Sequence, residues 1–467
     1  MALNLVRNSR VYFTSNVNSA GVVQASGFDA TNTQEIQVLD GFTFSQNTNA
    51  DVVTISEAGV APVRGQRSFN TSLAPVDFSL STYIRPANAT TSITAEESVL
   101  WNALFSTNAI STANTLTVAA TGVTAAYTFT NGDGVVTLTG TFTLGTLAVG
   151  DWVVISGLSH ANDGTILNAA AQVLTATSSS ITLALSAPKA AGAPITSITA
   201  PGAVKLYKSA WAPVTATYSV VSSGGSNANQ LQAFGMIFVV DNVTYVVDNC
   251  AMNQVMIDFG LDAIATAAWT GQGTVLRALS APLTLTSAGA KNTTAPFITN
   301  KLSTVSMSLV NALGSATAGT SYAIALTGGS ITINNNISYV TPANLGVVNL
   351  PAVYYTGTRA ITGTLNAYLK TGSGVGSTGQ LLQDMLAAAS ASIEPMAALS
   401  LVIGGTTNAT KVVLEMPAVT FSIPTVDVQQ VVSTAINFTA EGYTPGATSN
   451  VFALDETNDI AIRYYSA

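Results

Sequence analysis

The sequence predicts a mainly β protein with two tandem β domains, each carrying one short helix, and a small β domain inserted into the first. Short runs in which Thr or Val alternates with small polar residues recur along the 467 residues, for example at 135–144 and 330–340. Such period-two runs, bounded by Gly, Asn and Pro, are typical of strands. An internal duplication, and a break in its spacing, predict the division into domains.

Two segments have helical spacing instead. The first, residues 96–104, follows Thr94, a suitable N-cap, starts with two glutamates and spaces Leu100 and Leu104 four apart. The second, residues 381–389, repeats this spacing after a loop rich in Gly and Ser. We therefore expect two short amphipathic helices, each covering a sheet.

The chain contains a weak duplication in which four segments recur in the same order. Strand and helix patterns of the first half return at offsets of 285 and 282 residues, and two closing strands return at 167 and 169. The matched segments are 80–84 with 365–369, 99–104 with 381–386, 251–257 with 418–424, and 266–270 with 435–439.

The drop in offset between the helix and the closing strands locates an insertion of about 114 residues in the first copy. The extra segment, at about 106–209, is rich in strand patterns and regularly spaced glycines, so it reads as a small β-barrel or sandwich on the outside of its parent. The predicted domains are 1–105 with 210–290, the outward-facing insertion 106–209, and 291–467.

Composition excludes several function classes. One cysteine, Cys250, excludes an intrachain disulfide and a Cys-based zinc site, and one histidine, His160, leaves little for metal binding or general-base chemistry. The net charge of −8 argues against a protein that grips nucleic acid. Since no nucleophile–base or metal constellation is evident, we expect no enzyme activity and no cofactor.

Charged residues make up only 8% of the chain, far below the roughly 25% of an ordinary soluble protein. Such a surface suits a protein covered by copies of itself, whereas the alternative is an extracellular adhesin or receptor-binding fibre built from hydroxyl-bearing residues. Polar residues interrupt every apolar run, so no membrane span is expected. Arg7 and Arg10 fall where a signal peptide would have its apolar core, so we expect none.

Several segments resemble the major tail tube proteins of long-tailed bacteriophages, in particular those with two fused tube domains per chain. In the first half these are RNSRVYFTS, TNTQEIQVLDGFTFSQ, SEAGVAPVRGQRSFN and FSLSTYIRP, starting at Arg7, Thr31, Ser56 and Phe78. In the second half they are TGGSITINNNISYVTP and AYL, starting at Thr327 and Ala367. These are packing and loop patterns, not catalytic signatures, and they cover most of the chain outside the insertion.

The resemblance implies that each tube domain is a β-sandwich flanked by a helix, and that six domains close into a 24-stranded barrel. Two domains per chain then imply homotrimeric, pseudo-hexameric rings that stack into the virion tail tube, assembled in the host cytoplasm. Viral DNA would leave through the lumen without specific binding. Further implied partners are the tape measure protein within the lumen and terminator and baseplate or tip proteins at the ends; no membrane is involved.

A conduit for a polyanion should not hold it, so a neutral or weakly acidic lining is expected. Polar positions along the closing strands are the candidates, and the alternative is that they lie in turns or on an outer face. The candidate lumen-lining residues are Gln254, Asp258, Asp262 and, in the second copy, Asp427.

The resemblance also assigns the segment 51–69 to contacts with the next subunit or ring, whereas the alternative is a solvated hairpin loop. Gly59 and Gly65 would make this segment flexible. The candidate contact residues are Glu57, Arg64, Arg67 and Phe69, and acids near the C-terminus, among them Asp459, could accept the arginines across an interface.

Overall fold

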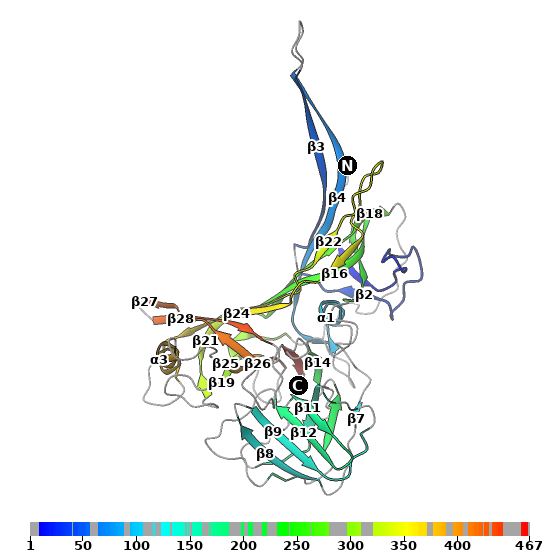
Figure 1. Ribbon diagram of the computed structural model, residues 1–467. Coiled ribbons are helices and arrows are strands. Elements are labelled where there is room, and N and C mark those ends of the chain that lie inside the picture. Colours follow the sequence, from blue (N-terminus) through cyan, green and yellow to red (C-terminus); the bar gives the residue numbers. More distant parts are fainter. Residues whose placement is uncertain are drawn as a thin grey trace.

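Antiparallel strands dominate the computed structural model, which confirms the mainly β class. Figure 1 shows an elongated molecule with a long hairpin at one end and a small β unit at the other. The structure describes residues 9–39, 41–56, 64–87, 94–105, 115–116, 123–130, 133–144, 147, 149, 152–160, 167, 170–185, 198–199, 204–208, 217–221, 231–241, 243–261, 263–279, 297–309, 321–370, 377–388, 396–404, 410–423, 425–428, 432–441 and 459–465.

Eight of the described strands pair side by side into one antiparallel sheet, here called the continuous sheet. Each half of the chain supplies four neighbouring strands, and the two halves join in the middle, where Gln254–Asp258 pairs with Ser330–Asn334. In spatial order the strands are β3 (Thr43–Ser56), β4 (Arg64–Tyr83), β17 (Thr266–Gly273), β16 (Val243–Asp258), β21 (Ala325–Asn334), β24 (Ala360–Tyr368), β28 (Val432–Ala440) and β27 (Thr425–Val428).

A second group of strands accompanies each half. In the first half β16 takes part in both groups, and in the second half β26 (Lys411–Phe421) pairs Val419–Phe421 with β28 beside β27. In the first half the order is β2 (Thr33–Ile36), β1 (Arg10–Thr14), β15 (Phe234–Val240), the start of β16, and β18 (Val275–Leu279). In the second half it is β20 (Ser321–Ala323), β19 (Thr304–Leu309), β25 (Met396–Gly404), β26 and β29 (Ala461–Tyr465). The strand β14 (Thr217–Val221), from the first half of the sequence, pairs with the outer edge of β29.

Strand alternation decides which side of the continuous sheet is buried. In β17 every second residue is buried, including Ala267 and Trp269, while the residues between them are partly exposed. The same alternation buries Ile331 and Ile333 in β21 and leaves their neighbours on the other side. One side of the sheet therefore faces a hydrophobic core, and the other is a continuous polar face.

The helices α1 (Ser98–Phe105) and α3 (Thr378–Ala388) confirm the two expected helical segments. Thr94 is not the N-cap of α1, because it lies in the short strand β6 (Thr94–Ala95), paired with β5 (Pro86–Ala87). In α3, Met385 is buried and Leu386 is 54% exposed, so the expected core position is shifted by one residue. Two smaller elements complete this region, the 3₁₀ helix η2 (Asn300–Leu302) and the hairpin of β22 (Ser338–Val340) and β23 (Val353–Tyr355).

The segment expected to be an insertion forms a sheet of its own. Its strands are, in spatial order, β7 (Thr115–Leu116), β13 (Lys205–Lys208), β10 (Trp152–Ser156), β11 (Ala170–Ala176), β12 (Ser180–Leu185), β9 (Asp133–Thr139) and β8 (Thr124–Thr130). Side chains such as Val136, Ile155 and Leu183 make a separate core. The structure places this unit at the end of the molecule opposite the long hairpin (Figure 1). The domain boundaries themselves stay a prediction.

The two halves connect their strands in the same way, since β4 lies between β3 and β17 as β24 lies between β21 and β28. Leu80 faces Trp269, and its sequence match Leu365 faces Ile436. Ile436 therefore corresponds to Trp269, and the sequence match of Trp269 with Phe438 is wrong by two residues. The sequence match failed because side-chain similarity alone does not reveal the pairing register of the strands.

Candidate assembly surfaces

The polar face of the continuous sheet is built from hydroxyl and amide side chains. Thr364 donates to Asn437 Oδ1 at 2.7 Å, Gln272 donates to Asp77 Oδ1 at 2.9 Å, and the hydroxyls of Thr43 and Ser79 lie 2.7 Å apart. These bonds cross from strand to strand and satisfy the polar groups within the sheet. The face is thus ordered by its own side chains.

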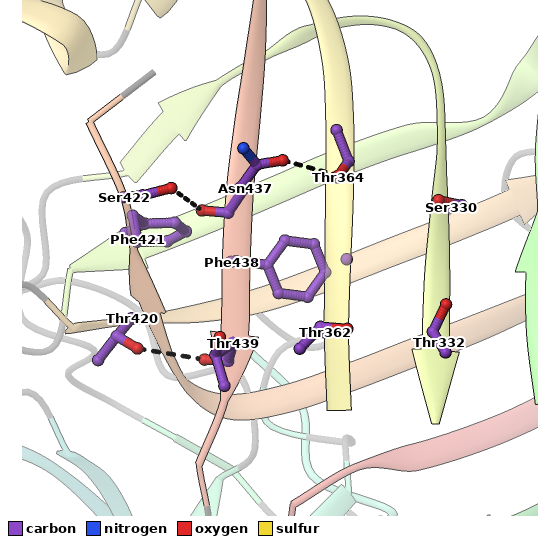
Figure 2. Close-up of a pocket in the computed structure, with 11 residues that line it drawn as sticks. Ser330, Thr332, Thr362, Thr364, Thr420, Phe421, Ser422, Asn437, Phe438 and Thr439 are labelled. Carbon is purple, nitrogen blue, oxygen red and sulfur yellow. Dashed lines mark hydrogen bonds between the residues drawn. The ribbon is translucent and has the colours of Figure 1, made fainter. Parts of the chain in front are cut away.

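A groove of about 480 Å³ lies on this face in the second half, and Figure 2 shows the residues that line it. Its polar lining consists of hydroxyls and one amide: Ser330, Thr332, Thr362, Thr364, Thr420, Ser422, Thr439 and Asn437. Phe438 packs over Gly363. A Cβ at position 363 would lie 2.3 Å from the Phe438 ring, so only glycine leaves room for the ring there. The groove therefore offers hydrogen bonds and no charge.

Electrostatically, the polar face is weakly acidic. The paired segments 76–83, 254–258, 266–273, 330–334, 360–368 and 432–440 contain no Lys or Arg. Asp77 and Asp258 are exposed and lie on the polar side, since their neighbours Val76, Phe78 and Ile257 are buried. Such a face repels a polyanion weakly and provides no cation to hold one.

The sequence-predicted lining residues fall on two corresponding strands. Gln254 and Asp258 alternate with buried Val255 and Ile257 in β16, so both lie on the polar face. Asp427 pairs with Ser433 in the second half, as Asp258 pairs with Thr266 in the first. Asp262 lies outside the described residues. That these residues line a lumen stays a prediction.

The sheet is open in a single chain. Among the described residues, β3 pairs only with β4 and β27 only with β28, so each has one edge without a backbone partner. An unpaired antiparallel edge is a template for a further strand. The described strands of one chain therefore form no closed barrel, but they present two edges that a second copy could occupy.

The predicted contact segment is a strand hairpin and less loop-like than expected. Strand pairing runs to Ser56 and resumes at Arg64, and Gly65 pairs with Ile55 within the ladder. Arg67 and Phe69 are exposed on β4, Arg64 begins that strand, and Glu57 lies outside the described residues. The ten residues 47–56, at about 3.3 Å each, span roughly 33 Å, and Figure 1 shows this hairpin reaching beyond the rest of the molecule. Contact with another ring stays a prediction.

Asp459 already has a partner within the chain. Arg359 Nη2 lies 2.6 Å from Asp459 Oδ2, and Nε of the same arginine lies 2.9 Å away. The suggestion that Asp459 accepts an arginine across an interface is therefore not supported, because both partners belong to the second half.

A buried polar cluster ties the first helix to the C-terminal strand. Trp101 Nε1 donates to the Tyr464 hydroxyl at 2.7 Å, and that hydroxyl in turn donates to Glu97. Burial raises the pKa of Glu97 to about 8, although its bonds to Tyr464 and Trp101 act in the opposite direction. Glu97 is therefore mostly protonated at neutral pH, which avoids a bare charge in the core.

Sequence reasoning missed one surface, the loop 341–352 between β22 and β23. It displays exposed apolar side chains, among them Leu345, Val347 and Val348. The available signal was the Leu-Gly-Val-Val run in a connection that corresponds to the β3–β4 hairpin of the first half.

Comparison with known proteins tests the resemblance to phage tail tube proteins. No family model matches the chain. Over 450 residues it is 25% identical to the tail tube protein pb6 of Escherichia phage T5, covering 94% of this chain and 73% of that protein. The resemblance to phage tail tube proteins is confirmed. As a structural protein of this kind, the chain is a component of the virion tail.

This similarity to a tail tube protein gives the surfaces above their context. The match extends across both halves of the continuous sheet, as its length requires. Within the described part of the chain, no helix is long and apolar enough to cross a membrane.

Proposed function

We propose that three copies of the chain close into a ring whose inner surface is a 24-stranded barrel formed by three continuous sheets. The observation that carries this proposal is the junction of β16 with β21 inside the chain. It joins the last strand of the first half to the first strand of the second. In spatial order, β27 is the last strand of the second half and β3 is the first strand of the first half. Both have a free edge, so the same junction can form between β27 of one chain and β3 of the next.

The internal junction also supplies the register of the external one. Asp258 lies opposite Ser330. Asp427 corresponds to Asp258, because the two pair with Ser433 and Thr266 at matched positions. Thr43 corresponds to Ser330, because the two pair with Ser79 and Thr364, which precede the matched Leu80 and Leu365. Asp427 of one chain is therefore expected opposite Thr43 of the next.

A crosslinking experiment tests this register. Directly opposed residues in an antiparallel pair have Cβ atoms about 4.5–5.5 Å apart, close enough for a disulfide after a small shift. The double variant T43C/D427C should give covalent trimers as the largest product on a non-reducing gel. Cys250 is buried and does not compete. The matched control is D51C/D427C, whose first cysteine lies eight residues, roughly 26 Å, further along β3.

Two results would contradict the proposal. Covalent hexamers would mean that six chains form a layer, and equal crosslinking of D51C/D427C would mean that the thiols meet by random collision. Negative-stain class averages along the cylinder axis provide an independent measurement, since a three-fold outline with a central hole is expected.

In this ring the polar face turns inward and the cores, with α1 and α3, lie outside it. Twenty-four strands spaced about 4.8 Å and tilted near 40° give a circumference of roughly 150 Å and a backbone diameter of about 48 Å. Side chains reduce this to about 40 Å, which is wide enough for duplex DNA. The absence of Lys and Arg from the segments 76–83, 254–258, 266–273, 330–334, 360–368 and 432–440 suits rapid passage of viral DNA into the host.

A further inference from the structure

The loop 341–352, here called the apolar loop, is held in place by the first half of the chain. The Tyr339 hydroxyl at its base donates to the carbonyl of Asn249 at 2.7 Å, and the Tyr354 hydroxyl donates to the carbonyl of Leu231 at 2.7 Å. Within the loop, the Asn349 side chain accepts from the Asn344 N–H at 2.7 Å. These hydrogen bonds hold the loop in a defined position, so it forms a platform for the side chains at its tip.

The apolar loop also extends the ladder of the long hairpin. The backbone of Asn349 accepts from Leu73 at 2.9 Å and donates to Thr71 at 3.1 Å, so the loop runs along β4. Figure 1 shows both hairpins rising from the same side of the molecule. The β3–β4 hairpin and the β22–β23 hairpin therefore lie together at the same end of the continuous sheet.

The side chains at the tip of this platform face solvent. Leu345 is fully exposed at a turn in which Gly346 has φ +84°, and Val347 is 63% exposed. A turn of this kind needs a residue with positive φ, and glycine provides it. Contiguous exposed apolar side chains, unlike single scattered ones, mark sites of protein interaction.

The opposite end of the same strands carries a second apolar group. Leu261 follows the end of β16 and is 46% exposed, and Phe297 is 53% exposed. Asn300 Nδ2 donates to the carbonyl of Gly260 at 3.0 Å, and the Tyr83 ring meets Phe297 edge-on at 5.2 Å, which draws this group together. Arg85 lies over the Phe297 ring at 4.7 Å. Leu261 and Phe297 are here called the apolar foot.

We propose that the apolar loop of one ring docks on the apolar foot of the ring above it, so that identical rings stack head to tail. The inference rests on the proposed ring. The supporting observation is that the apolar loop and the apolar foot lie at opposite ends of the same strands. A heterologous contact between two such surfaces repeats without closing and builds a filament. The occupant of the loop is therefore a second copy of this chain.

Substitutions that introduce negative charge at the tip of the apolar loop test the proposal. L345D/V347D should still give trimeric rings but raise the protein concentration needed for tubes at least ten-fold, measured by sedimentation and electron microscopy. L386D is the matched control, because Leu386 is 54% exposed on α3 and belongs neither to the apolar loop nor to the apolar foot. If L345D/V347D forms tubes as readily as L386D does, the stacking contact is refuted. Absence of rings from the native chain would instead refute the proposed function.

A mixing experiment tests direction. Rings of F297D retain an intact loop, and rings of L345D/V347D retain an intact foot. Purified rings of the two variants, mixed in equal amounts, should form pairs of rings and nothing longer. Long tubes in the mixture, or no pairs at all, would overturn the head-to-tail contact.

Discussion

Replacing Glu97 with glutamine should abolish a large part of the pH dependence of stability. Burial raises the pKa of Glu97 from 4.5 to about 8 in the folded chain. Between these values the unfolded chain loses the proton and the folded chain keeps it, so the free energy of unfolding decreases as the pH rises. From pH 5 to pH 8 the loss is roughly 3–4 kcal/mol, at about 1.4 kcal/mol for each pH unit.

The assay is urea unfolding of the unassembled chain, followed by tryptophan fluorescence at pH 5, 6.5 and 8. Wild type should lose stability toward pH 8 and E97Q should lose far less, because the amide does not ionise. Y464F provides a second variant, since losing the Tyr464 hydroxyl removes a bond that lowers the Glu97 pKa and so extends the slope to higher pH. Equal slopes for wild type and E97Q would refute the assignment.

Two further outcomes are expected. G363F and F438G should each destabilise the chain by about 1–5 kcal/mol through overpacking or a cavity, and the double variant should recover part of the loss in urea unfolding. The reason is that the corresponding pair in the first half has the reverse arrangement, with Phe78 packed over Gly271; a strictly additive double variant would contradict it. D258K should slow DNA ejection from particles, in a salt-dependent way, by adding a cation to each copy of the polar face; unchanged ejection kinetics would count against the lumen assignment.

Sequence alone predicted the mainly β class, both helical segments and the repeated order of strands. These features depend on local alternation and spacing, which neighbouring residues encode directly. Asp258 and Asp427 were both expected from the sequence as lining candidates, and the strand registers place them at corresponding positions. The cause is that an alternating strand fixes which residues share a face before any partner is known.

Tertiary structure alone decided the register between strands and the partners of single side chains. Trp269 corresponds to Ile436 because each faces a matched leucine across the ladder. Glu97 became a buried neutral acid because packing removes it from water, in a cluster that includes Tyr464, 367 positions away. The apolar loop became a platform because β4 and the Asn249 carbonyl, which accepts from Tyr339, hold it from the first half. Such contacts join residues distant in sequence, and their energies depend on three-dimensional packing that no local pattern records.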